Sequence, residues 1–327
     1  MAALMKTLGI CIPTYKRPEF LRRCVLSAIE AAAGRPIRIF IADDSTDRTN
    51  EAVLRELQAS HGFIEVHRNT SNLGIDANIQ QAVDMCDCDY AWLVGEDDAF
   101  LPGAVARMHA FLQDADDPFV FANYAYVGDD PAQSIGAPAM PVDGPATMNA
   151  GRFLAEHLWA VGFIGACVIR RAAWAGTTAA PYKGTYFTHA GRIAELIADA
   201  GHARVSRQCS VANRVEGEDT FTWKRDTYGV FFGFLAMCAS AAERRPAFAA
   251  ALKTAGKTMQ LRYRWLSLRL AMRLRSEHGY DRAQYLKYLR QAPIGRARRL
   301  ALHAISVSPP ALFRPLVRAY RALRRLA

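Results

Sequence analysis

The chain has 327 residues, of which 51% are hydrophobic, 22% charged and 10% aromatic. This length and balance are typical of one large domain with an appendage or of two modest domains, and they exclude a disordered or collagen-like chain. The formal net charge of +10 is unevenly distributed, because residues 252–327 hold 18 basic and 2 acidic side chains. We therefore expect a mildly acidic body followed by a strongly basic C-terminal region.

The first 125 residues alternate between short β-branched runs and helical patterns. Strands are predicted at residues 8–15, 37–42, 63–68, 90–94 and 119–127, and helices at residues 18–33, 50–60, 75–85 and from Pro102. This alternation predicts an α/β fold, a Rossmann-like and mostly parallel sheet with helices on both faces.

The pattern changes after residue 127. A long loop is predicted at residues 128–145, then a helix at 150–160, a strand at 166–170 and a helix at 190–200. From Thr222 onward the pattern is almost wholly helical. We expect one domain over residues 1–221 and a helical, basic region over residues 222–327.

Seven cysteines are scattered along the chain without the spacing of a disulfide framework or of paired CxxC metal ligands. No secretory signal pattern stands at the N-terminus. The longest uncharged apolar stretch, residues 227–242, is shorter than the roughly 20 residues of a membrane-spanning helix. These features predict a cytoplasmic location.

Two acidic clusters follow predicted strands. Asp43 and Asp44 follow the second strand, and Glu96, Asp97 and Asp98 follow the fourth. Ligands bind at the carboxyl ends of parallel strands, and crowded carboxylates need a cation or a hydrogen-bonding ligand to offset their charge. Mg²⁺ or Mn²⁺, which takes carboxylate and diphosphate oxygens, is the simplest explanation. The alternative is that each aspartate caps a helix or turn.

Phosphate-binding glycine motifs are missing after the first strand, where residues 12–17 read IPTYKR. GxGxxG does not occur, which disfavours a dinucleotide-binding Rossmann domain, and GxxxxGK[ST] does not occur either, so the sequence has no P-loop motif.

Four segments together carry a family resemblance. They read ICIPTYKR at residues 10–17, IADDSTD at 41–47, NTSNLG at 69–74 and VGEDD at 94–98. The chain thereby resembles the family 2 glycosyltransferases of the GT-A fold over about residues 7–210. Within that family it is similar to the abequosyltransferase-like group, which builds bacterial surface polysaccharides.

The resemblance implies roles for the residues at these motifs. Pro13 and Tyr15 would lie beside the nucleotide base, Asp44 would recognise the base or ribose, and Asp43 would line the same pocket.

The resemblance also implies a metal site. Asp97 would be the metal-binding acid, with Asp98 beside it. Gly95 stands where the first aspartate of the family's DXD motif usually lies, so either Glu96 substitutes for it or one ribose contact is missing.

Sugar transfer needs a base that removes the acceptor hydroxyl's proton. Family members usually supply it from a Glu-Asp pair opening a late helix that ends in Gly, and spacing from Gly201 puts that pair at His189 and Ala190. His189, with an unperturbed pKa near 6.5, is the candidate. Glu218 and Asp219 are the competing candidates. The alternatives are a structural histidine and a helix cap before Thr222.

The C-terminal region interleaves Arg and Lys with apolar and aromatic residues, as in LRYRWL at residues 261–266. Such helices can lie in a membrane interface with their basic groups toward anionic headgroups. We expect peripheral attachment to the inner face of the cytoplasmic membrane, the alternative being a solvated basic bundle. No nucleic-acid-binding signature accompanies the charge, which disfavours nucleic acid as a partner.

The resemblance implies an inverting, metal-dependent transfer from a nucleotide-diphosphate sugar to a hydroxyl of a lipid-linked glycan acceptor in surface polysaccharide synthesis. Two rivals stay open. One is a sugar nucleotidyltransferase, although its Gly-rich phosphate loop is missing. The other is a non-catalytic glycan- or lipid-binding scaffold, which Gly95 and the missing acid pair would favour.

Overall fold

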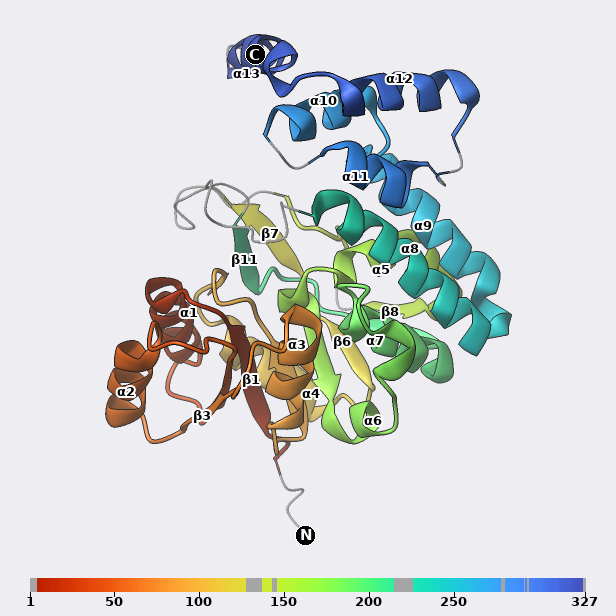
Figure 1. Cartoon of the computed structure of the whole chain (residues 1–327). Helices are drawn as coiled ribbons and strands as arrows, with labels where there is room; N and C mark the ends of the chain where they lie inside the picture. Colours follow the sequence, from red (N-terminus) through yellow and green to blue (C-terminus); the bar gives the residue numbers. More distant parts are fainter. Residues whose placement is uncertain are drawn as a thin grey trace.

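The structure is a computed structural model that describes residues 5–127, 137–142, 146–214, 226–277, 280–290, 292 and 294–325. A central sheet flanked by helices forms the body, and a layer of short helices lies at one end of it (Figure 1).

The central sheet has eight strands in the order β3-β2-β1-β4-β9-β6-β10-β8. They are β1 (Leu8–Thr14), β2 (Arg38–Asp43), β3 (Ile64–Arg68), β4 (Tyr90–Leu93), β6 (Phe119–Phe121), β8 (Ala146–Asn149), β9 (Cys167–Arg170) and β10 (His202–Val205). Strands β9 and β8 run against the other six, because β9 pairs antiparallel with β4 and β6, and β8 pairs antiparallel with β10. The predicted α/β fold with a mostly parallel sheet is confirmed.

Strand β1 lies at the centre of the parallel half, between β2 and β4. All but one of its residues are buried, as expected for a strand covered on both faces. Gly9 permits this packing, because a Cβ there would lie 2.8 Å from the Phe40 ring and 2.6 Å from Cys86 Sγ.

Within the described residues, seven α-helices accompany the sheet. They are α1 (Pro18–Ala31), α2 (Glu51–Ser60), α3 (Ile75–Asp84), α4 (Ala104–Gln113), α5 (Ala150–Val161), α6 (Arg171–Ala175) and α7 (Thr188–Ala200). Helix α7 begins before the predicted residue 190, and it ends at Gly201, whose φ of 75° lies in the left-handed region that glycine adopts easily.

A second, three-stranded sheet has the order β5-β11-β7. Its strands are β5 (Ala99–Phe100), β7 (Tyr124–Val127) and β11 (Val211–Arg214). The single strand predicted over residues 119–127 is therefore wrong, because the chain leaves the central sheet after β6. The buried Asn123 explains the break, since its amide bonds the backbone N and O of Met140 instead of continuing a strand.

The C-terminal part is helical, as expected. It comprises α8 (Thr227–Arg244), α9 (Ala249–Tyr263), α10 (Leu268–Ser276), α11 (Arg282–Gln284), a π-helical segment (Tyr285–Leu289), α12 (Arg296–Val307) and α13 (Arg314–Arg325). Helix α8 packs on α7, and α9 packs on α5 and α8. The predicted domain boundary at residues 221 and 222 lies outside the described residues.

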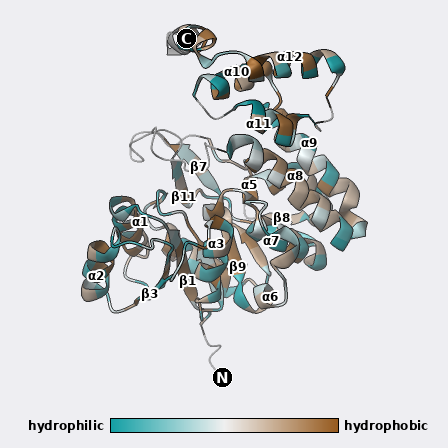
Figure 2. Cartoon of the chain, in the orientation of Figure 1, coloured by the Kyte–Doolittle hydropathy of each residue, from teal (hydrophilic) through white to brown (hydrophobic). Residues whose placement is uncertain are grey.

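Helices α10 to α13 form the layer at the end of the molecule, drawn in blue in Figure 1. Aromatic contacts attach this layer to α8: the Phe232 and Tyr288 rings stack with centroids 5.5 Å apart, and Tyr228 meets Tyr280 edge-on at 5.2 Å. Hydrophobic and hydrophilic positions alternate along these helices (Figure 2).

Of the described helices, none by itself has the length and apolarity to span a bilayer. Arg296–Val307 and Pro310–Ala319 meet those criteria only jointly, as a pair bent by 109°.

Candidate functional site

The first acidic corner is built where β1 and β2 end. Asp43 is fully buried, and its Oδ1 accepts hydrogen bonds from Asn50 Nδ2 at 2.9 Å and from the Ser45 amide at 3.1 Å. Its Oδ2 lies 3.6 Å from Arg68 Nε. Asn50 Nδ2 also approaches Thr14 Oγ1 at 3.3 Å, so the end of β1 is joined to this corner.

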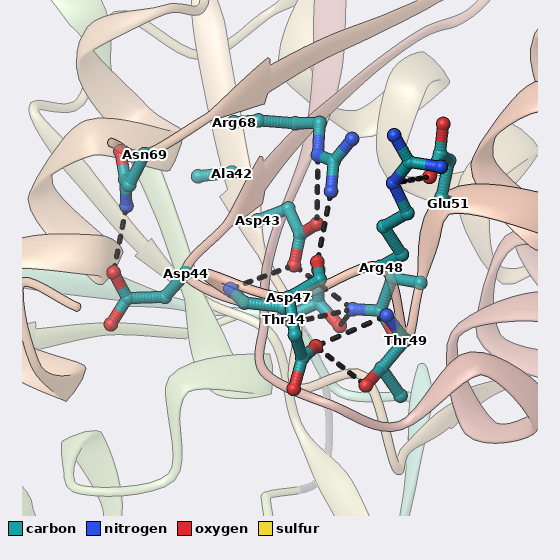
Figure 3. Close-up of polar contacts among 12 residues, drawn as sticks. Thr14, Ala42, Asp43, Asp44, Asp47, Arg48, Thr49, Glu51, Arg68 and Asn69 are labelled. Carbon is teal, nitrogen blue, oxygen red and sulfur yellow. Dashed lines mark hydrogen bonds and ion pairs between the residues drawn. The ribbon is translucent and has the colours of Figure 1, made fainter. Parts of the chain in front are cut away.

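Asp44 points away from Asp43, toward Asn69 (Figure 3). Its Oδ1 accepts from Asn69 Nδ2 at 3.0 Å and from the Leu73 amide at 2.7 Å, and its Oδ2 accepts from the Gly74 amide at 3.0 Å. Gly74 has a φ of 80°, which favours glycine at this turn. Asp44 therefore holds the loop that precedes α3.

The second acidic corner follows β4. Glu96 Oε2 accepts from the Tyr15 amide at 2.7 Å, and Glu96 Oε1 lies 3.6 Å from Arg17 Nε. Burial raises the pKa of the Glu96 carboxyl to about 8, although hydrogen bonds from the Thr14 side chain and the Tyr15 amide oppose the shift. Arg17 Nη1 also donates to Asp97 Oδ2 at 2.9 Å, so one guanidinium serves two acidic side chains.

Gly95 makes room for the carboxylates that follow it. A Cβ at this position would lie 2.8 Å from Asp98 Oδ2 and 3.1 Å from Asp97 Oδ1. Both carboxylates therefore occupy the space that a side chain at position 95 would need, and this is the position where the family motif usually carries its first aspartate. Cys24 Sγ donates to the Gly95 carbonyl at 3.5 Å, and burial, aided by the charge of Asp98, raises the thiol's pKa well above its usual range.

The carboxylates of the loop after β4 are the candidate ligands of a divalent cation. Among the described residues, no group of three or more His, Cys, Asp or Glu side chains could hold a metal ion. Asp97 and Asp98 nevertheless present oxygens to one small region, and two carboxylates suffice for Mg²⁺ or Mn²⁺ when diphosphate oxygens and water complete the shell. The donor set fits such a cation bound together with a diphosphate.

The two corners meet around the end of β1. Thr14 contacts Asn50 of the first corner, and its carbonyl accepts from the Asp44 amide at 2.9 Å, while the next residue, Tyr15, donates its amide to Glu96 of the second corner at 2.7 Å. Residues far apart in sequence are thus brought to one carboxyl edge of the sheet.

The two residues expected beside a nucleotide base flank Thr14. Pro13 pairs in register with Ala42 of β2 and is partly buried. The side chain of Tyr15 is 38% exposed, and Lys16 Nζ lies 5.4 Å from the centre of its ring. Lys16 thus lies over one face of the ring, and Tyr15 is partly exposed to a planar ligand.

His189 lies in the first turn of α7 and is only 2% exposed. Its Nε2 lies 3.1 Å from the Val161 carbonyl, which only accepts, so Nε2 carries the proton. Its Nδ1 is buried without a hydrogen-bond partner among the described residues, and burial lowers the pKa of the imidazole. Glu218 and Asp219 lie outside the described residues.

Sequence reasoning missed several polar side chains of this region. Asn50, Asn69 and Asn78 fix the loops after β1, β2 and β3, and Asn78 donates to the Ala42 carbonyl at 3.0 Å. Asp76 accepts from the Tyr186 and Thr188 amides at 3.0 and 3.1 Å, so it caps α7 from α3. Only Asn69, directly after the third strand, stood at a position that the sequence could mark, because Asn50 directly precedes α2 and Asn78 lies within α3. Nothing local marks Asp76 as a partner of α7.

Residues 9–175 match the family model for glycosyl transferase family 2. The chain belongs to this family. The abequosyltransferase RfbV of Salmonella typhimurium is 30% identical over 116 residues, which make up 35% of this chain and 34% of that protein. The match thus spans only about a third of that relative's length.

Solved structures share the fold at low identity. TarS of S. aureus, residues 1–349, covers 97% of this chain and 91% of that structure at 12% identity, with a TM-score of 0.58. The mannosyltransferase PcManGT of Pyrobaculum calidifontis, in complex with GDP-Man and Mn²⁺, covers 96% and 84% at 14% identity, with a TM-score of 0.54. These likenesses show the GT-A fold.

Proposed function

We propose that this chain is a glycosyltransferase that transfers a sugar from a nucleotide-diphosphate donor to a hydroxyl of a glycan acceptor. The observation that carries the proposal is the meeting of both acidic corners around Thr14 and Tyr15 at the carboxyl edge of a family 2 domain. Structural neighbours in complex with UDP, UDP-GlcNAc and GDP-Man support a nucleotide-sugar donor.

In this proposal the first corner binds the nucleoside. Tyr15, which is open to solvent, and Pro13 contact the base. Asp44 recognises the base or ribose while holding residues 73 and 74 in place, and the buried Asp43 keeps Asn50 and the end of β2 fixed. A loop fixed in this way loses little freedom when the donor binds.

The second corner binds the diphosphate. Asp97 and Asp98 would hold Mg²⁺ or Mn²⁺, which when bound would neutralise the leaving diphosphate. Glu96 stands in for the aspartate missing at Gly95, and its contact with the Tyr15 amide couples the two corners. Arg17 balances the charge of Glu96 and Asp97.

The acceptor's proton needs a base, for which three candidates stay open: His189, Glu218 and Asp219. His189 has the basic nitrogen Nδ1, but it is buried within α7, so an acceptor hydroxyl would reach it only after a movement of the chain. This favours Glu218 or Asp219. We propose inversion at the anomeric carbon, which one direct displacement assisted by a single base would produce.

We further propose that the acceptor is a lipid-linked glycan of bacterial surface polysaccharide synthesis and that the enzyme is cytoplasmic, attached to the inner face of the membrane. The similarity to an abequosyltransferase and the basic, amphipathic C-terminal helices support this. The expected location is tested by flotation of the full chain with phosphatidylglycerol vesicles. No flotation would contradict it.

The activity is tested with a panel of nucleotide sugars, with and without Mn²⁺, by measuring release of the nucleotide product. We expect slow release of nucleoside diphosphate from one donor, lost in Asp97→Asn and retained in Asp87→Asn, which alters an exposed carboxylate outside both corners. Formation of pyrophosphate would indicate a nucleotidyltransferase. A chain that neither binds nor cleaves any donor would be a scaffold, and the proposed function would be wrong.

A further inference from the structure

A hollow of about 480 Å³ lies between the π-helical segment and α12, away from both acidic corners. The described residues that line it are mainly basic, aromatic and aliphatic: Tyr285, Leu286, Arg290, Arg296, Arg299, Leu300 and His303. None of them is acidic. The hollow therefore offers positive charge and apolar surface side by side.

The arginines of the hollow differ in their partners. Arg299 donates to the carbonyls of Arg290, Ala292 and Ile294, so it holds the turn that leads into α12. Arg290 and Arg296 are exposed, and within the described part of the chain neither makes an ion pair with a carboxylate. Two guanidinium groups are thus available to an external anion.

The apolar part of the lining is exposed. Leu286 is 44% and Leu300 is 70% exposed, and Leu312 and Leu316 nearby in sequence are 60% and 61% exposed. A free phosphate would use only the arginines and would leave these leucines in water. A phosphate carried on a hydrocarbon chain would satisfy both parts of the hollow.

We propose that this hollow binds the phosphate group of a lipid, with the phosphate between Arg290 and Arg296 and the hydrocarbon chain against Leu286 and Leu300. The proposal deepens the proposed function, on which it rests, by assigning a place to the phosphate of a lipid-linked acceptor.

The hollow is connected to the body of the enzyme by a short series of contacts. Gln284, directly before the π-helical segment, donates to Asp226 Oδ1 at 3.3 Å, and Asp226 Oδ2 accepts from the Tyr186 hydroxyl at 3.0 Å. Tyr186, in turn, donates its amide to Asp76 of α3. A lipid held at the hollow is therefore next to the π-helical segment, which these contacts join to Tyr186 and to α3.

The test measures binding of the full chain to phosphatidylcholine vesicles doped with a polyprenyl phosphate. These vesicles carry little other charge, so diffuse attraction is small. The double variant Arg290→Gln/Arg296→Gln should bind about tenfold or more weakly, the effect of losing charge-assisted hydrogen bonds. The matched control Arg273→Gln/Arg282→Gln removes the same charge from exposed positions of α10 and α11 and should stay within about threefold of the parent chain.

Three results would overturn the proposal. They are equal losses in the two double variants, which would indicate diffuse attraction; equally strong binding of inorganic phosphate that is lost in Arg290→Gln/Arg296→Gln, which would indicate a site for free phosphate in the hollow; and preference for an RNA oligonucleotide. Leu300→Ser should weaken lipid binding without changing the melting temperature, and an unchanged affinity would also count against the proposal. Donor cleavage by the parent chain, measured in parallel, separates the lipid site from the proposed function. A parent chain that binds the lipid but cleaves no donor would contradict the proposed function alone.

Discussion

Arg17 Nη1 lies 2.9 Å from Asp97 Oδ2, and both side chains are largely buried. The guanidinium therefore occupies one oxygen of the carboxylate to which we assign a metal, and its Nε lies 3.6 Å from Glu96. A cation that arrives at Asp97 must share this carboxylate with Arg17.

We predict that Arg17→Gln binds Mn²⁺ about tenfold more tightly, because a nearby positive charge opposes the cation. Isothermal titration with MnCl₂ in the absence of donor measures this. Arg55→Gln, which removes a surface charge on α2, should leave the affinity unchanged. Equal affinities of Arg17→Gln and the parent chain would show that Arg17 and the cation do not compete.

Asp44→Asn should loosen the loop before α3. The carboxylate accepts from the Leu73 and Gly74 amides and from Asn69, and weakening such charge-assisted bonds costs about 1.5–3 kcal/mol. We expect a lower melting temperature and at least tenfold weaker binding of the nucleoside diphosphate product. Asp47→Asn, at an exposed position of the same segment, is the control. A variant that melts early but binds normally would confine Asp44 to a structural role.

His189 should make the free energy of unfolding depend on pH, with a loss of stability in acid. Because burial lowers the pKa of the folded imidazole below its usual 6.5, the unfolded chain binds a proton that the folded chain does not. Stability is then complete above pH 6.5 and falls as the pH drops below that value. His189→Gln keeps an N–H for the Val161 carbonyl but cannot titrate, so its melting temperature should fall less in acid.

The same variant tests catalysis. If His189 is the base, turnover should drop by about 10²–10⁴ with donor binding intact. Near-normal turnover would remove this assignment and leave Glu218 and Asp219, which Glu218→Gln and Asp219→Asn test directly.

Glu195 should hold α8 to α7. It is 1% exposed, accepts from the Tyr182 hydroxyl at 2.7 Å, and contacts Arg244 at 2.6 Å and Arg245 at 3.0 Å. Glu195→Ala should lower the free energy of unfolding by about 3 kcal/mol, the low end of the cost of breaking a buried ion pair, because both arginines keep contact with water. Urea titration measures this, with Glu243→Ala on α8 as the control. A loss no larger than that of the control would contradict the assignment.

The parallel half of the sheet could be predicted because its strands are short apolar runs separated by helices with a clear 3.6-residue period, as in Ile75–Asp84. The positions of Asp44 and Asp97 at strand ends followed from the same pattern. The second sheet could not be predicted, since Ala99–Phe100 and Val211–Arg214 are too short to carry a period and pair across a long stretch of chain.

The contacts of the site were less accessible to sequence reasoning. Arg17 is close to Asp97 only because β1 and β4 are adjacent, and the break at Asn123 depends on where Met140 lies in space. Neither relationship leaves a mark in local composition. Residue types at strand ends were informative, whereas their partners were set by topology.

Asp226 is shared between two parts of the protein, since it caps α8 through the Gly229 amide and also bonds Tyr186 and Gln284. Hybrid enzymes made by exchanging C-terminal helices between relatives should therefore be joined upstream of Asp226, so that this aspartate and Gln284 come from the same parent. A junction placed within α9 would instead pair a foreign Gln284 position with the resident Asp226, and the transplanted helices would arrive without their native anchor.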